Sequence, residues 1–133
     1  DRYVKDSDME QARAVYDSNQ FGDPQTNVFS VFSGDPVRFR IISGYSEQPQ
    51  MFSLEAHEWE LTPEIPGSDR VSSRYLPSTG VLNVRIPSAG GPNKHTGDFM
   101  WSNHRQTHQK IGQWGLMRVL ATDGHSNLKP LSD

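Results

Sequence analysis

The sequence of 133 residues predicts an all-β fold, a Greek-key β-sandwich with a short N-terminal helix. Short apolar runs alternate with turn residues about every ten positions, which is typical of sandwiches and barrels. Eleven glycines and nine prolines supply the turns. A chain of this length is expected to build one core. We therefore predict an N-terminal extension over residues 1–26, a β domain over 27–121 and a C-terminal tail over 122–133.

One helical pattern lies in the N-terminal extension. Ser7 and Glu10 have the S-x-x-E spacing of a capping box. Apolar residues then recur at helical spacing from Met9 to Tyr16, which predicts a helix over about residues 8–18. A helix this short is marginal alone, so we expect it to pack on the edge of the domain.

Apolar runs that alternate or are bounded by turn residues predict the strands. They cover residues 27–33, 37–43, 50–61, 81–86, 98–101 and 116–120. The clearest is VRFRIIS at 37–43, in which alternation turns Arg38 and Arg40 toward solvent. Residues 62–78, rich in proline and serine, are predicted to be an irregular connection.

Charge and composition exclude several functional classes. The formal net charge of −3 argues against nucleic acid as the main partner, because phosphate backbones require a basic surface. The absence of cysteine excludes disulfides, zinc–thiolate sites and cysteine nucleophiles. No run of about 18 apolar residues occurs, so no membrane span is expected.

Two histidines stand out because they lie four residues apart in a polar loop between two predicted strands. His104 and His108 are candidate metal ligands, and two solvated loop histidines are the alternative. Together with Glu55 and His57 they offer nitrogen and carboxylate donors that suit a single Cu, Zn, Fe or Mn ion.

Other polar and aromatic residues have simpler interpretations. His95 and His125 are predicted to be solvated, and the three tryptophans are predicted to pack in the core or an interface. Outer-face arginines of the strands are predicted to be solvated, with a face for an acidic partner as the alternative. These are Arg38, Arg40, Arg85 and Arg118.

Three stretches resemble the last cupredoxin domain of multicopper oxidases. They are GDPVRFRII, QMFSLEAHEW and GDFMWSNHRQTHQKIGQWGLMRV, and the resemblance covers about residues 27–121. In that family one strand carries H-x-x-x-x-H-x-H, and a later loop carries H-C-H-x-x-x-H followed by an axial ligand. The first pattern falls on Gln50, Glu55 and His57. The second falls on Ser102, Asn103, His104 and His108, with Gln113 in the axial place.

The resemblance implies two ligand sets, both degenerate. The type 1 copper set falls on Gln50, Asn103, His108 and Gln113. Because the cysteine place is Asn103 and no thiolate exists, we expect no type 1 copper.

The second set corresponds to four outward histidines that share a trinuclear copper cluster with another domain in the family. Strand alternation is expected to place Glu55 and His57 on one face, and Ser102 and His104 on one face. The resemblance thus implies copper as the cofactor, bound through His57 and His104 with Glu55 as a carboxylate. A vestigial site that binds no metal is the alternative.

The resemblance implies a domain or subunit of a multicopper-oxidase-like oxidoreductase, located in the periplasm or secreted. Its partners would be other cupredoxin domains or subunits of the same oligomeric assembly, and the isolated chain is not expected to be an active enzyme. Two alternatives stay open. One is a stand-alone metal-binding module that uses Glu55, His57, His104 and His108. The other is a metal-free interaction domain whose oligomers survive chelator treatment.

Overall fold

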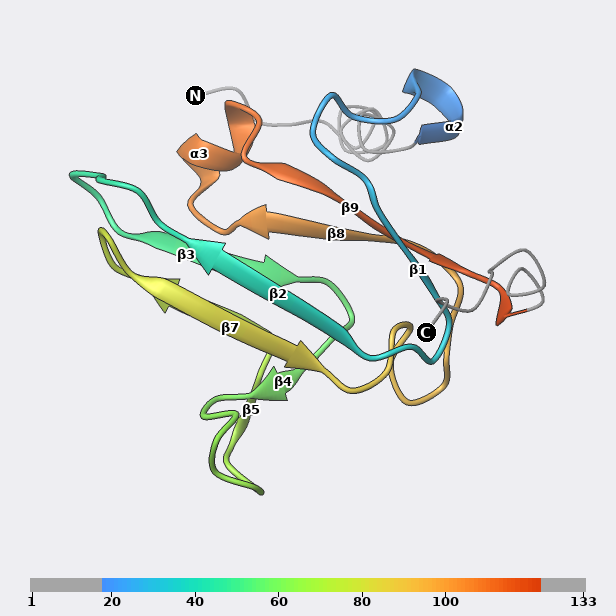
Figure 1. Cartoon of the computed structure of the whole chain (residues 1–133). Coiled ribbons are helices and arrows are strands. Elements are labelled where there is room, and N and C mark those ends of the chain that lie inside the picture. The colour runs from blue at the N-terminus through green and yellow to red at the C-terminus, as the bar shows by residue number, and fades with distance from the viewer. Residues whose placement is uncertain (1–17, 123–133) are drawn as a thin grey trace, which may run out of the picture.

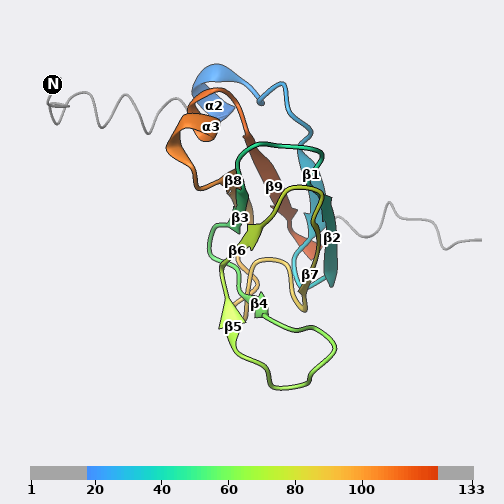
Figure 2. The ribbon, with the colours of Figure 1, turned by 90° about the vertical axis from the view of Figure 1, so that its left-hand side faces the viewer.

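Two facing β-sheets form the structure, a computed structural model that describes residues 18–122 (Figure 1). Five strands form the larger sheet, in the order β1-β9-β8-β3-β6. They span Phe29–Phe32 (β1), Trp114–Leu120 (β9), Gly97–Asn103 (β8), Gln50–Leu54 (β3) and Ser73–Leu76 (β6). The facing sheet pairs β2 (Val37–Ile42) with β7 (Val81–Ile86). Seen edge-on, the two sheets lie in separate layers (Figure 2), which confirms the predicted all-β sandwich.

Smaller elements complete the described part of the chain. A third, two-stranded sheet pairs β4 (Trp59–Glu60) with β5 (Arg70–Val71). Two short helices, α2 (Ser18–Phe21) and α3 (Gln106–Lys110), precede β1 and β9 respectively. No helix within residues 18–122 is long and apolar enough to cross a membrane.

The core lies between the inner faces of the two large sheets. Along β2 the side chains alternate between partly buried and exposed, so Arg38 and Arg40 point outward as predicted. The fully buried side chains include Leu54, Trp59 and Met117. Each buried side chain of this size contributes about 1.5–3 kcal/mol, so apolar burial holds the two layers together.

The pairing of the central strands brings two of the three stretches side by side, QMFSLEAHEW on β3 and GDFMWSNHRQTHQKIGQWGLMRV on β8 and β9, whereas GDPVRFRII ends in β2 of the facing sheet. Strand β8 pairs antiparallel with both β3 and β9, while β1 joins the edge of β9 in parallel. Gly115 of β9 lies opposite Trp101 of β8, and a Cβ at this glycine would overlap the indole ring. Only glycine allows the tryptophan to cross the strand here.

The predicted strand over 50–61 is wrong in its middle. Strand β3 ends at Leu54, residues 55 and 56 form a turn, and β4 begins at Trp59. Ala56 takes a positive φ of 54°, a left-handed conformation that stops the alternation of a strand. The side chains of residues 55–58 therefore do not follow the predicted faces.

Three further elements were not predicted. The connection over 62–78 contains β5 and β6, and the loop between β8 and β9 contains α3. Strand β6 is held by pairing with β3, a tertiary contact that composition does not reveal. Helix α3 buries none of its residues, so it has no apolar periodicity to detect. The predicted helix over 8–18, apart from Ser18, and the tail beyond residue 122 lie outside the described residues.

An ion-pair cluster fixes the segment before β1 to the larger sheet. The guanidinium of Arg118 on β9 contacts Asp23 at 2.7 Å and Asp98 on β8 at 2.8 Å. The hydrogen bond from Arg118 lowers the pKa of Asp23 below its ordinary value. The hydrogen bonds from Asp98 and then Asp23 raise the pKa of Arg118, which stays charged throughout.

Candidate metal centre

The four residues predicted in the type 1 copper places converge at one end of the sandwich. Gln50 opens β3, Asn103 closes β8, His108 lies in α3, and Gln113 precedes β9. Backbone bonds hold the loop that carries them: Asn103 N–H donates to the Gln113 carbonyl at 3.0 Å, and Gln113 N–H to the His108 carbonyl at 3.0 Å. These backbone bonds bring the four residues together at one end of the sandwich.

The side-chain amide of Asn103 lies at the centre of the four. Its Nδ2 donates to Oε1 of Gln113 at 2.8 Å and to Oε1 of Gln50, and it lies 3.0 Å from Nδ1 of His108. Nδ1 of His108 is also 2.8 Å from Oε1 of Gln50. An amide nitrogen carries two hydrogens, so the consistent assignment gives both to the glutamines and protonates Nδ1 of His108, which donates to Gln50.

The carbonyl side of the Asn103 amide is also satisfied. Its Oδ1 accepts from the backbone N–H groups of Met51 at 3.3 Å and Arg105 at 3.1 Å. Gln50 is fixed in turn, because its Nε2 donates to Oγ of Ser46 at 3.0 Å and to the Gln48 carbonyl at 3.1 Å. Asn103 is buried, so these bonds replace the water that its amide loses on folding. We call Gln50, Asn103, His108 and Gln113 the amide cluster.

The amide cluster does not fit type 1 copper. Such a site needs a cysteine thiolate and two histidine nitrogens around the ion, with a weak axial ligand. Here the central position is an amide nitrogen whose hydrogens point at the neighbouring oxygens, and the chain has no cysteine. The two glutamine oxygens accept from Asn103, and the imidazole nitrogen Nδ1 of His108 donates to Gln50.

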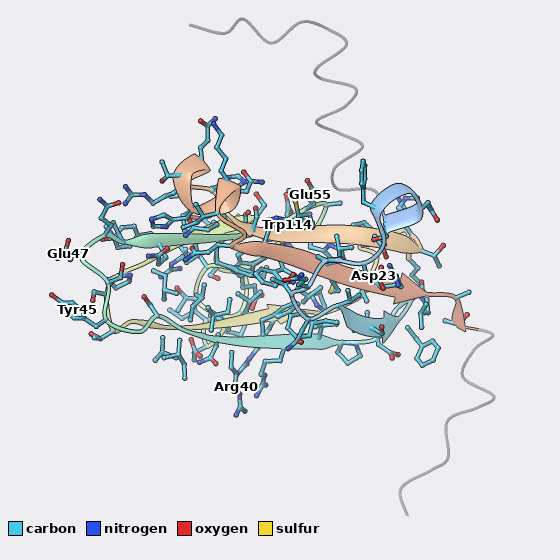
Figure 3. The ribbon with its side chains drawn as sticks, turned by 90° about the horizontal axis from the view of Figure 1, so that it is seen from above. Asp23, Arg40, Tyr45, Glu47, Glu55 and Trp114 are labelled. Atoms are coloured by element: carbon cyan, nitrogen blue, oxygen red, sulfur yellow. The ribbon has the colours of Figure 1, made fainter. Side chains whose placement is uncertain are left out.

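The second predicted set is not brought together. Ser102 is buried against Ser53, with their Oγ atoms 3.2 Å apart, while His104 is exposed. Glu55 is exposed in the turn after β3 (Figure 3), and its Oε2 accepts from the backbone N–H of Met100 at 3.4 Å. Alternation was expected to place Glu55 and His57 on one face of a strand, and this is wrong because the strand ends before them.

His57 is buried inside the fold, with 2% of its surface exposed. Its Nδ1 lies 2.7 Å from the carbonyl of Glu55, and its Nε2 accepts from the backbone N–H of Gly90 at 3.0 Å. The ring also packs edge-on against Phe99, with centroids 4.7 Å apart. Both ring nitrogens are therefore engaged by backbone groups, and this histidine serves the fold between β3 and the loop after β7.

Gly90 explains why that loop can approach the imidazole. It has a φ of +80°, and a Cβ there would overlap the backbone of His95. No sequence pattern linked Gly90 to His57, which lies 33 residues earlier. Within residues 18–122 no group of three His, Asp or Glu side chains comes together to hold a metal ion.

The structure also contains two neighbouring surface hollows that the sequence did not predict. A larger one, of about 680 Å³, lies beside His57 and includes Glu58 and Ser72 in its lining. A smaller one, of about 320 Å³, lies between the ends of β2, β7 and β5 and brings Arg38, Arg70 and Arg85 together.

Comparison with known proteins identifies the fold. No protein-family model matches the sequence, and no curated protein is significantly similar to it. A multicopper oxidase structure aligns over 69% of this chain and 32% of its own, at 16% identity and a TM-score of 0.58. A copper nitrite reductase from Nitrosomonas europaea aligns over 80% and 35%, at 14% identity and a TM-score of 0.58.

A third structure, blue copper oxidase from Nitrosomonas europaea, aligns over 83% of this chain and 38% of its own, at 16% identity and a TM-score of 0.57. The chain thus spans between 32% and 38% of the lengths of these three neighbours. Likeness at such identity shows the fold alone. The described part of this chain has the cupredoxin-like β-sandwich found in domains of multicopper oxidases and copper nitrite reductases.

Proposed function

We propose that this chain is a domain or subunit of a multicopper-oxidase-like assembly, and that it packs against other cupredoxin domains without holding type 1 copper. The observation that carries the proposal is the amide cluster. The four type 1 places converge as they would in a copper site, but hydrogen bonds between Asn103, Gln50, His108 and Gln113 satisfy the donors. Without a thiolate this end of the domain cannot take up electrons as a blue copper site does.

Exposed apolar side chains at the same end favour a role in contacts. Ile42 and Val81 are cross-strand partners at the end of the β2–β7 sheet, and they are 75% and 64% exposed. Tyr45, in the loop before β3, is 86% exposed (Figure 3), and Ile111, after α3, is 77% exposed. The guanidinium of Arg105 donates to the Pro49 carbonyl at 3.2 Å, which joins that loop to the α3 region. Exposed aromatic and aliphatic groups gathered at one end suit a protein partner.

The surroundings of His57 and His104 limit which of them could contribute to a shared copper site. His57 has both ring nitrogens engaged and is buried, so reaching a metal would require breaking the fold around it. His104 is exposed at the end of β8. We therefore restrict the proposed contribution to a copper site completed by another domain to His104, in an assembly outside the cytoplasm.

Copper titration tests the metal part of this proposal. Chelator-stripped protein is titrated with Cu²⁺ and followed by visible absorption and electron paramagnetic resonance. We expect no intense thiolate band and no one-to-one signal with nitrogen coupling. A stoichiometric nitrogen-coupled signal that His57→Ala and His104→Ala both abolish, while His95→Ala leaves it intact, would instead establish a stand-alone metal-binding module.

Sedimentation velocity tests the contact part, with a second copy of the chain as the available cupredoxin partner. We expect self-association that persists in chelator and is weakened by Tyr45→Ser and by Ile111→Ser. Ile65→Ser is the matched control, because Ile65 is 59% exposed in the loop between β4 and β5, and that loop lies at the end of the fold opposite α3 (Figure 2). A monomer at every concentration, or equal weakening by the control, would contradict packing through this end.

A further inference from the structure

Two arginines face each other on the outer surface of the β2–β7 sheet. Arg38 and Arg85 are direct cross-strand partners, and both side chains are exposed. Like charges placed directly opposite each other destabilise a sheet. Among the described residues, neither guanidinium lies within ion-pair distance of a carboxylate, since the pairs formed there involve Arg70 and Arg118. This local excess of positive charge stands out on a chain whose net charge is −3.

A third arginine reaches the same place from another strand. Arg70 of β5 lines the hollow of about 320 Å³ together with Arg38 and Arg85. Arg70 is held by Glu58, through an ion pair of 3.6 Å from Nε and a hydrogen bond of 3.0 Å to the Glu58 carbonyl. The hollow thus has one arginine fixed by a carboxylate and two that lack one.

The remaining wall of the hollow is stiff and mostly apolar. Pro36 and Pro87 lie at the ends of β2 and β7, and proline fixes the backbone φ angle. Glu60 is the carboxylate in the lining, and its Oε1 accepts from the backbone N–H of Gly67 at 3.5 Å. The backbone that carries these arginines therefore lies in paired strands beside rigid corners, so it loses little conformational freedom when a ligand binds.

We propose that this hollow binds a small oxyanion of the phosphate or sulfate class. Guanidinium groups donate two parallel hydrogen bonds to such oxygens, and charge-assisted bonds of this kind are about twice as strong as neutral ones. A dianion between Arg38 and Arg85 also removes the repulsion between them. The volume of about 320 Å³ exceeds that of one oxyanion, so a phosphate monoester with a small organic group also fits. This site is independent of the amide cluster and of the proposed assembly.

Titration with inorganic phosphate at constant ionic strength, with chloride as the replaced ion, tests the proposal. Binding is followed by NMR chemical shifts of backbone amides on β2, β5 and β7. We expect saturable shifts, and at least tenfold weaker binding in Arg38→Gln and Arg85→Gln, because each loses a charge-assisted pair. Glu60→Gln should tighten binding several-fold by removing the carboxylate from the lining.

Arg40→Gln is the matched control. Arg40 lies on the same face of β2, two residues beyond Arg38 and opposite Asn83, and it does not line the hollow. Its side chain points away from the sandwich (Figure 3). Arg40→Gln removes the same charge, so binding should change by less than about twofold, the effect of a screened distant charge. Equal losses in Arg40→Gln and Arg38→Gln would reduce the effect to diffuse attraction and overturn the site, as would shifts that do not saturate.

A second arm separates two sources of the oxyanion. Glycerol phosphate is titrated in parallel with inorganic phosphate. Tighter binding of the ester would identify an organic phosphate as the ligand class, and equal or weaker binding would identify the free oxyanion. Loss of both in Arg85→Gln is required in either case, and binding of both by that variant would refute the proposal.

Discussion

Replacement of Asn103 by alanine tests whether the amide cluster stabilises this end of the sandwich. The substitution removes two hydrogen bonds that Nδ2 donates, to Gln50 and Gln113, and two that Oδ1 accepts, from Met51 and Arg105. It also leaves two backbone N–H groups without their partner.

The size of the loss follows from these contacts. Four hydrogen bonds of about 0.5–1.5 kcal/mol each amount to roughly 2–6 kcal/mol. Gln50 and His108 are half-buried, so water entering the space replaces part of this. We expect Asn103→Ala to lower the free energy of unfolding by about 3 kcal/mol. For a chain of this length that corresponds to a melting temperature lower by roughly 10 °C.

Urea unfolding followed by tryptophan fluorescence measures the change, with His104→Ala as the control. His104 is the next residue and its ring is exposed, so its replacement should cost no more than about 0.5 kcal/mol. A double-mutant cycle between Asn103 and Gln113 should show a coupling of about 1 kcal/mol, since the two side chains share a bond of 2.8 Å. If Asn103→Ala costs no more than His104→Ala, or the cycle is additive, the cluster does not stabilise the domain.

Three further outcomes are expected. The double variant Asn103→Cys with Gln50→His completes a Cys-His-His set with an axial glutamine, so the protein should turn blue with Cu²⁺. The control variant Asn103→Ser with Gln50→His should stay colourless. A colourless Asn103→Cys variant would show that this end of the domain lacks the geometry of a type 1 copper site. His57→Ala should lower the free energy of unfolding by about 3 kcal/mol in urea, because a buried ring and two hydrogen bonds are lost, and it should leave copper titration unchanged. Arg118 lowers the pKa of Asp23 in the folded protein. The contribution of this pair to the stability of the fold is therefore fully present above the ordinary pKa of aspartate, about 3.9, and it is lost as the pH falls through the lower pKa of the folded state. In NMR titrations Arg118→Gln should move the Asp23 midpoint upward, and an unmoved midpoint would contradict this assignment.

The sequence predicted those parts of the fold that local patterns determine. Strand β2 shows this best, because one face is apolar and the other carries Arg38 and Arg40, so its register has one solution. The resemblance singled out Gln50, Asn103, His108 and Gln113 as one set, and in the structure their side chains are joined by hydrogen bonds.

The remaining features depend on contacts between distant segments. The buried position of His57 depends on a positive φ at Ala56, which no residue pattern predicts, and on a hydrogen bond from Gly90 on another loop. The meeting of Arg85 with Arg70 depends on how the β4–β5 sheet packs near β7, which β4 contacts. Local propensity carries no information about such contacts between distant segments. The sequence therefore pointed to reactive side chains but not to their arrangement in space.

The amide cluster explains how an end shaped like a copper site stays folded without a thiolate. A bound metal ion links its ligand segments and so adds its binding free energy to folding. Here the Asn103 amide links the same segments: through Gln50 it holds β3, through Gln113 it holds the start of β9, and through the Arg105 N–H it holds the loop before α3. Both polar atoms of the buried Asn103 side chain have hydrogen-bond partners, so this amide has no free atom that would bind an ion or a water molecule. These hydrogen bonds link the segments as a metal ion would, but they supply no redox chemistry, which agrees with the proposed role in contacts.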